Sequence, residues 1–384
     1  MSDNPWLASG FGRVTREVVS RLCRHPGMQL VVKGWGACER AGNPHQWPFR
    51  VFPSVPEYYG QASFGDVIRQ FAPDVVITLG EVRSIHWIRM HEARPTFKWI
   101  GYIPLDSGPF YPPWQPIFAD MDGIVAMSRF GRRVIELGVP SKPVQVSYHG
   151  VDTTVFRPLP DRSLLRNHER FRGKFIVGCV ARNQMRKNLP SLIKAFSLLA
   201  RCFKDIHLYL HCTASDEGHD LVTLFKRYGL QGRADLSRPD LTIEQPLPDV
   251  ALNQLYNLFD ISVLPTMGEG FGLPIIESLA AGTPVVATNC SACTELIHGH
   301  GELARVLTTL TLGPSVLDQA VVDVDDLARC IEKLYLNPQL RSEYGVSGRR
   351  FAETLTWDAV IPSWLEIVSH VSGVDITETS STRL

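Results

Sequence analysis

Short apolar runs alternate with amphipathic segments along most of the chain, and this alternation limits the possible folds more than any other feature. The apolar runs are typical of strands buried on both faces, and the amphipathic segments are typical of helices that cover a sheet. Consecutive units of strand, helix and strand build parallel sheets. We therefore expect an α/β protein with parallel, doubly wound sheets.

The alternation falls into two series, which predicts two domains, since one hydrophobic core stops growing well below a length of 384 residues. In the first half we expect strands at 29–33, 75–79, 99–103, 123–127 and 144–147, and helices at 64–71 and 130–137. In the second half we expect strands at 175–181, 206–211, 240–244, 261–264 and 284–287, and helices at 189–202, 220–228, 249–259, 273–281, 325–336, 339–353 and 357–370. The predicted boundaries are an N-terminal domain at 1–155, a polar linker at 156–172, a C-terminal domain at 173–355, a C-terminal helix at 356–370 and a disordered tail at 371–384.

The beginning of the chain is unusual for this arrangement. Residues 2–6 resemble the exit from a strand, but no strand precedes them. In a doubly wound sheet the first strand lies at the centre, so its absence would leave the middle of the first sheet open. Either the sequence starts downstream of its natural beginning, or the domain fills the central position in another way. We favour the first explanation.

Composition excludes several classes of protein. Lys and Arg together number 39 and are balanced by 39 Asp and Glu, so the basic excess of a nucleic-acid-binding chain is lacking. No apolar stretch is long enough to span a bilayer, and the first residues do not resemble a signal peptide. The eight scattered cysteines suit a reducing compartment. We expect a cytoplasmic protein. Two properties are left open, namely peripheral contact with the inner face of the membrane and the oligomeric state.

The strongest chemical motif is a glycine-rich loop that follows the strand expected at 261–264. Gly270 and Gly272 let the backbone come close to a ligand, and Pro274 suits the first turn of the next helix. The free N–H groups at a helix start favour an anion, which predicts a diphosphate site. The groups expected to face this anion are those of Phe271, Gly272 and Leu273.

Two carboxylates flank this loop, with seven residues between them. Glu269 lies in the loop, where it can reach a sugar hydroxyl. Glu277 lies about one turn into the helix, where it can accept both hydroxyls of a ribose. The alternative interpretation is an ordinary turn between strand and helix, with two solvated acids.

A second motif follows the strand expected at 175–181 and carries Arg182, Lys187 and Asn188. Ligands of open α/β sheets bind at the carboxyl ends of strands, where these residues lie. Two fixed cations can neutralise a diphosphate leaving group, a task that a divalent metal performs in other enzymes. We therefore expect no metal and no cofactor, and we expect Asn188 to cap the next helix. A solvated basic loop is the alternative.

Together the two motifs resemble the retaining GT-B glycosyltransferases of family 4, also described as glycosyl transferases group 1. The resemblance covers nearly the whole chain, and it implies two Rossmann-like domains that face a central cleft. It also implies that the C-terminal half holds a nucleoside diphosphate sugar. In the family, the residues matching Glu269 and Glu277 contact the donor sugar and the ribose, and those matching Arg182 and Lys187 hold the diphosphate.

The resemblance extends to the N-terminal half. Residues 9–13 resemble the acceptor loop of the family, which makes Gly10, Phe11, Gly12 and Arg13 the candidate acceptor-binding residues. Residues 148–152 resemble the asparagine-glycine-valine-aspartate turn at the domain junction, with His149 in place of the asparagine. The segment from Trp357 resembles a C-terminal helix that often crosses back to the first domain.

Many family members carry a histidine near the reacting carbon, after the fourth or fifth N-terminal strand. Here Asp106 occupies the corresponding place, and it is our candidate to orient the donor sugar or an acceptor hydroxyl. A turn-forming role before the Ser-Gly-Pro segment that follows is an equally good interpretation.

The resemblance implies transfer of a hexose to an acceptor hydroxyl with retention, in polysaccharide or glycolipid assembly, so that the expected partners are a nucleotide sugar and a carbohydrate or glycolipid. An epimerase or phosphorylase of the same fold is an alternative for which no motif is visible. A catalytically inactive nucleotide-sugar-binding or assembly protein is a second alternative.

Two short patterns are better explained by helix starts than by metal sites. Asp323 and Asp325 imitate the DxD metal motif of other glycosyltransferases, but we expect Asp325 to cap a helix. Cys290 and Cys293 form a lone CxxC with no second pair, so we expect a helix start there and no zinc.

Overall fold

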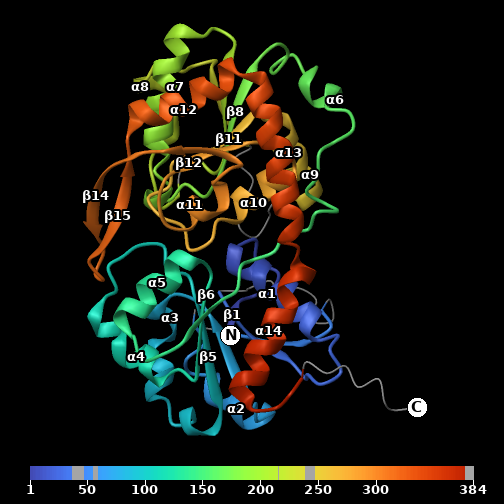
Figure 1. Cartoon of the computed structure of the whole chain (residues 1–384), viewed down its shortest axis with the longest axis vertical. Helices are drawn as coiled ribbons and strands as arrows, with labels where there is room; N and C mark the ends of the chain where they lie inside the picture. Colours follow the sequence, from blue (N-terminus) through green and yellow to red (C-terminus); the bar gives the residue numbers. More distant parts are fainter. Residues whose placement is uncertain (37–46, 55–58, 215, 238–246, 377–384) are drawn as a thin grey trace. The chain divides into compact units, whose positions relative to one another are not determined.

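The computed structural model describes residues 1–36, 47–54, 59–214, 216–237 and 247–376, which fold into two compact units (Figure 1). Unit 1 consists of Met1–Leu105, Pro109–Gly150 and Trp357–Leu384, and unit 2 consists of Asp106–Gly108 and Val151–Thr356. After Thr356 the chain therefore returns to the first unit.

Unit 1 contains two parallel sheets, with strand orders β1-β2-β3 and β4-β5-β6-β7. The strands are β1 (Ser2–Asp3), β2 (Val31–Trp35), β3 (Arg50–Pro53), β4 (Val75–Leu79), β5 (Lys98–Ile103), β6 (Gly123–Ala126) and β7 (Val144–Val146). The helices are α1 (Gly10–Leu22), α2 (Phe64–Phe71), α3 (Val82–Ile85), α4 (Gln115–Asp120), α5 (Arg129–Gly138) and α14 (Trp357–Ser372), with short 3-10 turns at His86–Met90, Arg94–Thr96 and Pro112–Trp114.

The first strand is present, although it is only two residues long. Ser2–Asp3 pairs in parallel with β2, and the N–H of Leu79 in β4 donates to the carbonyl of Met1 at 2.9 Å. Residues 1–3 therefore lie between β2 and β4, at the position of a central first strand. The expectation that this strand is missing is wrong. Asn4 extends the pairing, because its backbone N–H and its side-chain amide both donate to the carbonyl of Trp35, at 3.0 and 2.8 Å.

Unit 2 is built on one parallel sheet with the order β10-β9-β8-β11-β12-β13, and a separate antiparallel hairpin of β14 and β15. The strands are β8 (Phe175–Val180), β9 (Ile206–His211), β10 (Ala234–Leu236), β11 (Ile261–Leu264), β12 (Val285–Thr288), β13 (Gly301–Ala304), β14 (Val306–Leu312) and β15 (Leu317–Val322). The helices are α6 (Ser163–Arg166), α7 (Leu189–Cys202), α8 (Leu221–Arg227), α9 (Asp249–Leu258), α10 (Leu273–Ala280), α11 (Ser291–Ile297), α12 (Val324–Leu336) and α13 (Pro338–Thr354), with a 3-10 turn at Met185–Lys187. The α/β class with parallel sheets is confirmed.

The order of the strands in unit 2 creates a switch point. From β8 the chain proceeds through β9 to β10 in one direction, and from β11 through β12 to β13 in the other. Strands β8 and β11 are therefore neighbours at the place where the order reverses, with Val177 opposite Ile261. In open α/β sheets, ligands bind outside the carboxyl ends of the strands at such a point.

The core of unit 2 explains why several of its strands and helices could be predicted from the sequence. All six residues of β8 are buried, so the strand is a continuous apolar run. In α7 the buried residues Leu192, Phe196 and Leu199 recur every three or four positions, which gives the helix one apolar face. This helix packs against α12, and α10 packs against α13 (Figure 1).

Several elements were not predicted. The hairpin of β14 and β15 exposes six of the seven residues of β14, so it lacks the buried pattern that identifies the other strands. β3, α1, β10 and β13 were also missed, and the predicted linker contains the short helix α6. The strand expected at 240–244 lies outside the described residues. The predicted tail begins inside α14, which continues to Ser372.

The expected helix start at the CxxC segment is observed, since Cys290 is the N-cap of α11. The prediction that Asp325 caps α12 is wrong, because the N-cap is Asp323, two residues earlier. Asp323 accepts the N–H groups of Asp325 and Asp326 at 3.0 and 3.1 Å, whereas the side chain of Asp325 is exposed. The carboxylate must precede the helix to reach its free N–H groups, and only Asp323 does so.

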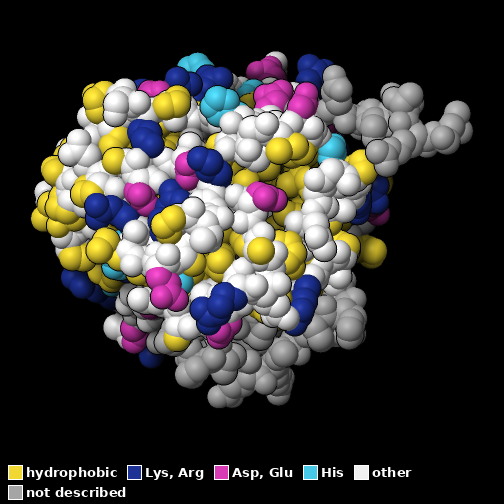
Figure 2. All heavy atoms as spheres, turned by 90° about the horizontal axis from the view of Figure 1, so that it is seen from below, with side chains coloured by type: hydrophobic (Ala, Val, Ile, Leu, Met, Phe, Trp, Pro, Cys, Tyr) yellow, Lys and Arg dark blue, Asp and Glu magenta, His cyan; other side chains and the backbone are white. Residues whose placement is uncertain are grey.

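The surface agrees with the balanced composition. In the view of Figure 2, Lys and Arg side chains and Asp and Glu side chains are interspersed among hydrophobic and uncharged atoms. Within the described residues, none of the helices is both long enough and apolar enough to cross a membrane.

We expect Asp323→Ala to lower the free energy of unfolding by about 1–2 kcal/mol, because α12 would lose the acceptor for two N–H groups. Asp325→Ala removes an exposed carboxylate and should change it by less than about 0.5 kcal/mol. Urea unfolding followed by circular dichroism measures both, and equal effects of the two substitutions would contradict the assignment of the cap.

Candidate functional site

The two sequence motifs meet at the switch point of unit 2. The segment after β8 and the segment after β11 lie side by side, and the N–H of Met267 donates to the carbonyl of Arg186 at 2.8 Å. On its other side, Met267 accepts the N–H of Ala320 in β15 at 2.9 Å. The glycine-rich loop is therefore held between the loop after β8 and the β14–β15 hairpin.

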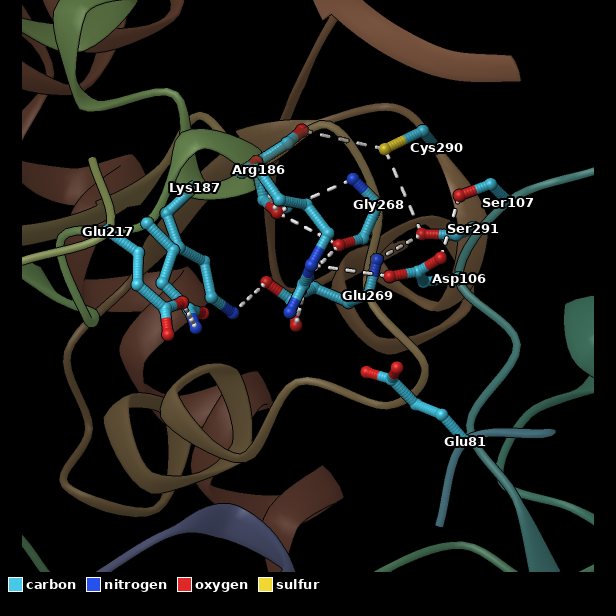
Figure 3. A network of polar contacts seen from close by, with 12 residues as sticks. Glu81, Asp106, Ser107, Arg186, Lys187, Glu217, Gly268, Glu269, Cys290 and Ser291 are labelled. Carbon is cyan, nitrogen blue, oxygen red and sulfur yellow. Dashed lines mark hydrogen bonds and ion pairs between the residues drawn. The ribbon is translucent and has the colours of Figure 1, made fainter. Parts of the chain in front are cut away.

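A buried ion pair lies at the centre of this region. The Nζ of Lys187 lies 2.6 Å from Oε1 of Glu269, and Nη1 of Arg186 lies 3.3 Å from Oε2 (Figure 3). Glu269 is 5% exposed, so its charge is largely removed from water. A buried carboxylate is stable in the charged form only when it is paired, and here two cations share that role.

The charges of this cluster set its protonation. Burial alone would raise the pKa of Glu269, but the nearby cations of Lys187 and Arg186 lower it to about 2, from an ordinary value of 4.5. Burial lowers the pKa of Lys187, as does the positive charge of Arg186, and the contact with Glu269 opposes both. Glu269 is therefore ionised at neutral pH.

The loop itself needs glycine at two positions. Gly272 precedes α10 with a φ of 110°, in the left-handed region that side chains disfavour. A Cβ on Gly268 would lie 2.3 Å from the carbonyl oxygen of Asp106. Of the predicted diphosphate-binding residues, Gly270, Phe271 and Gly272 form the loop, and Leu273 is the first residue of α10.

Glu277 lies on α10, one turn into the helix, and is also 5% exposed. Its Oε2 accepts a hydrogen bond from the hydroxyl of Tyr256 at 2.8 Å. Both glutamates of the motif are thus buried and paired, so the interpretation as two solvated acids does not fit the structure.

Arg182 lies apart from the ion pair of Lys187. Its side chain is 42% exposed and contacts the carboxylates of Asp216 at 3.1 Å and Glu217 at 3.7 Å. Arg186, which our sequence analysis did not select, contacts Glu269 instead. The adjacent Arg-Lys pair in a loop after a buried strand is the signal that could have identified it.

Asp106 lies beside the same cluster, within unit 2. Its Oδ2 is 3.3 Å from Nε of Arg186, and its Oδ1 accepts a hydrogen bond from Ser107 at 2.7 Å (Figure 3). The carbonyl of Gly108 accepts the N–H of Asp318 at 2.6 Å, which attaches this short segment to β15. Arg186 therefore joins two carboxylates, those of Asp106 and Glu269.

The candidate acceptor residues of unit 1 have a different secondary structure from the one expected. Gly10, Phe11, Gly12 and Arg13 form the first turn of α1 and not a loop, because Ser9 caps this helix by accepting the N–H of Gly12 at 2.9 Å. A role in acceptor binding remains a prediction.

His149, which replaces the asparagine of the family turn, is buried in unit 1. Its Nδ1 lies 2.9 Å from the hydroxyl of Tyr102, and that hydroxyl lies 2.7 Å from the carbonyl of Ser147. Burial lowers the pKa of His149 to about 3, so the ring is neutral at neutral pH. The residue packs as part of an aromatic cluster with Tyr102 and Trp357.

Comparison with known proteins identifies this region. Residues 174–337 match the family described as Glycosyl transferases group 1. The matched residues lie within unit 2, which is therefore the part of the chain that is similar to group 1 glycosyltransferases. The matched range begins just before β8 and ends just after α12, so it contains the predicted site residues of unit 2 other than Asp106, together with Arg186.

Curated relatives extend the similarity beyond the matched range. The chain is 27% identical over 283 residues to the MMP alpha-(1->4)-mannosyltransferase of Mycolicibacterium hassiacum, which covers 73% of this chain and 59% of the relative. The chain spans less than three fifths of the length of this relative and of two others, a D-inositol 3-phosphate glycosyltransferase and a lipopolysaccharide core mannosyltransferase.

Two solved structures share the fold. Sucrose-phosphate synthase from Thermosynechococcus elongatus superimposes with a TM-score of 0.73 at 16% identity, covering 94% of this chain and 92% of that one. Anabaena HepE, solved in complex with UDP and glucose, superimposes with a TM-score of 0.72 at 18% identity, covering 94% and 96%. The predicted GT-B fold is confirmed.

Among the residues that the structure describes, no group of three or more His, Cys, Asp or Glu side chains is arranged to hold a metal ion.

The lowered pKa of Glu269 predicts a specific dependence of stability on pH. A carboxylate with a depressed pKa in the folded state stabilises that state above its ordinary pKa of 4.5, and loses this contribution as the pH falls toward about 2. Between about pH 5 and pH 2, the free energy of unfolding should fall by about 2–3 kcal/mol more in the wild type than in Glu269→Gln. Urea unfolding at several pH values tests this, and parallel curves would contradict it.

Proposed function

We propose that this chain is a retaining glycosyltransferase that moves a hexose from a nucleoside diphosphate sugar to an acceptor hydroxyl without a bound metal. The observation that carries the proposal is the buried carboxylate of Glu269, which is held by Lys187 and Arg186 at the switch point and lies four residues before the first residue of α10. This arrangement supports the proposal, because an acid that can bind sugar hydroxyls lies near a helix start suited to an anion.

The donor diphosphate fits the start of α10. The N–H groups of the first helical turn are unpaired within the helix, and the helix dipole favours negative charge there. Lys187 adds a fixed positive charge nearby. The exposed Arg182 can exchange its surface carboxylates for phosphate oxygens at little cost, because surface ion pairs are weak.

The two glutamates bind the two other parts of the donor, the sugar and the ribose. Glu269 accepts hydrogen bonds from hydroxyls of the sugar, and Glu277 accepts those of the ribose. Because burial and neighbouring groups fix both side chains, little rotational entropy is lost on binding.

The chemistry follows from stabilising the leaving group. The bond between the anomeric carbon and the diphosphate oxygen breaks, and the acceptor oxygen bonds to the same face of that carbon. The acceptor proton passes to the departing phosphate. Positive charge at Lys187 and Arg182, together with the helix start, stabilises the negative charge that develops on the diphosphate.

The relatives support this choice of donor and reaction. One is named as a mannosyltransferase, and the structure of another was solved with UDP and glucose. A polysaccharide or glycolipid acceptor is the expectation from the family resemblance. The acceptor would contact unit 1, where Gly10 and Arg13 begin α1.

Nucleotide binding gives a direct test. In a thermal-shift panel of UDP, GDP, ADP and their common hexose conjugates, one diphosphate at about 100 times its dissociation constant should raise the melting temperature by about 5 °C. A chelator should leave this rise unchanged. Absence of any rise with well-folded protein would contradict the donor site, and a rise abolished by the chelator would contradict the metal-free mechanism.

Glu269→Gln should lower kcat for sugar transfer by about 100- to 1,000-fold and change the affinity for the free nucleoside diphosphate by less than about threefold. Lys187→Met should weaken that affinity by at least about tenfold. Lys194→Met is the matched control, because Lys194 is an exposed lysine on α7 away from the site. Nucleotide binding without transfer in the wild type would favour the inactive nucleotide-sugar-binding protein.

A further inference from the structure

Backbone strain is concentrated around the ion pair of Lys187 and Glu269. The non-glycine residues with positive φ among those described are Ala72, Asn188, Ser291 and Val316. Asn188 follows Lys187 directly and has a φ of 50°. Ser291, with a φ of 45°, contacts Glu269. Left-handed backbone costs free energy for residues with a Cβ, and it persists where surrounding contacts enforce it.

Ser291 is the more informative of these two residues, because asparagine tolerates the left-handed region better than serine does. It is the first residue of α11 and is 8% exposed. Its Oγ accepts the backbone N–H of Glu269 at 2.8 Å, and donates to Sγ of Cys290 at 3.8 Å (Figure 3). The hydroxyl therefore has both a donor and an acceptor around it.

The next residue of α11 holds the other side of the same backbone unit. The N–H of Ala292 donates to the carbonyl of Glu269 at 3.4 Å. Both backbone polar groups of Glu269 are thus bonded to the first two residues of α11, and its carboxylate is bonded to Lys187 and Arg186. The residue is fixed at its backbone and at the end of its side chain.

The neighbouring loop residues are fixed in the same way. The hydroxyl of Thr266 donates to the carbonyl of Gly268 at 3.0 Å, and Sγ of Cys290 donates to the carbonyl of Thr266 at 3.7 Å. Cys290 therefore connects Ser291 to the residues that precede Glu269. A shift at Ser291 would be transmitted to the whole segment from Thr266 to Glu269.

We propose that Ser291 is a positioning residue that sets the place of Glu269 in the sugar transfer proposed above. The role rests on that function, since Ser291 acts on the reaction only through Glu269. Glycine would adopt the same φ without strain, but it has no hydroxyl to accept the N–H of Glu269. The left-handed backbone of Ser291 costs conformational free energy, and the hydroxyl that it positions fixes the place of Glu269. Strain of this kind is typical of functional sites.

Two substitutions distinguish the effect of losing the Ser291 hydroxyl from the effect of relieving its backbone strain. Ser291→Ala removes the hydroxyl and keeps the unfavourable φ, so its melting temperature should fall. Ser291→Gly also removes the hydroxyl but relieves the φ, so its melting temperature should stay close to that of the wild type. We expect kcat to fall by about 10- to 100-fold in both variants, because a misplaced Glu269 no longer matches the transition state. The affinity for the free nucleoside diphosphate should change by less than about twofold in both.

Matched controls are available in the same chain. Ala72→Gly relieves a φ of 47° at the end of α2 in unit 1, and it should raise the melting temperature without changing kcat. Ser197→Ala removes a buried hydroxyl that donates within α7, and it should lower the melting temperature without changing kcat. If kcat falls in proportion to the melting temperature across all four variants, the proposal is overturned.

A second measurement needs no substrate. Amide hydrogen exchange at Glu269, followed by NMR, should be at least about tenfold faster in both Ser291 variants than in the wild type, because the N–H loses its acceptor. An active wild type whose Ser291 variants keep kcat within about twofold, or keep the exchange rate of Glu269, would overturn the role of Ser291 alone. A wild type that binds no nucleotide and transfers no sugar would overturn the proposed function, and this role with it.

Discussion

The ion pair between Lys187 and Glu269 is the interaction on which the candidate site depends. Its partners are 82 residues apart in the sequence, and they meet because β8 and β11 are adjacent at the switch point of the sheet. A charge of this kind is costly to bury alone, so each partner requires the other in the folded chain. Arg186 adds a second cation and links Glu269 to Asp106. The fold and the chemistry are thus coupled at one contact.

Much of unit 2 could be predicted from the sequence because its strands are buried on both faces. The bounds expected for β9, β11 and α7 match those observed, since apolar runs and 3.6-residue spacing leave little ambiguity. The glycine-rich loop was recognisable because glycine and proline have specific conformational uses. The β14–β15 hairpin was not recognisable, because most of β14 is exposed and carries no core pattern.

The details of the site were less predictable for a different reason. Which of the cations after β8 reaches Glu269 is decided by side-chain direction and by long-range pairing, which sequence spacing does not contain. Arg182 turns to Asp216, and Arg186 turns to Glu269. In unit 1, the two-residue strand β1 lies between β2 and β4, because Met1 bonds to β4 and Asn4 extends the pairing with β2. So short a strand has no periodicity to detect.

The loop that carries Glu269 is bonded by segments from three distant parts of the sequence, namely the loop after β8, the start of α11 and the strand β15. A loop with this many external bonds has already lost most of its conformational freedom before any ligand arrives. A ligand that binds this preorganised loop gains contact energy and has to order little of the protein. In the proposed sugar transfer, such a loop would tolerate few differently shaped sugars, and variety among donors would have to arise elsewhere around the site.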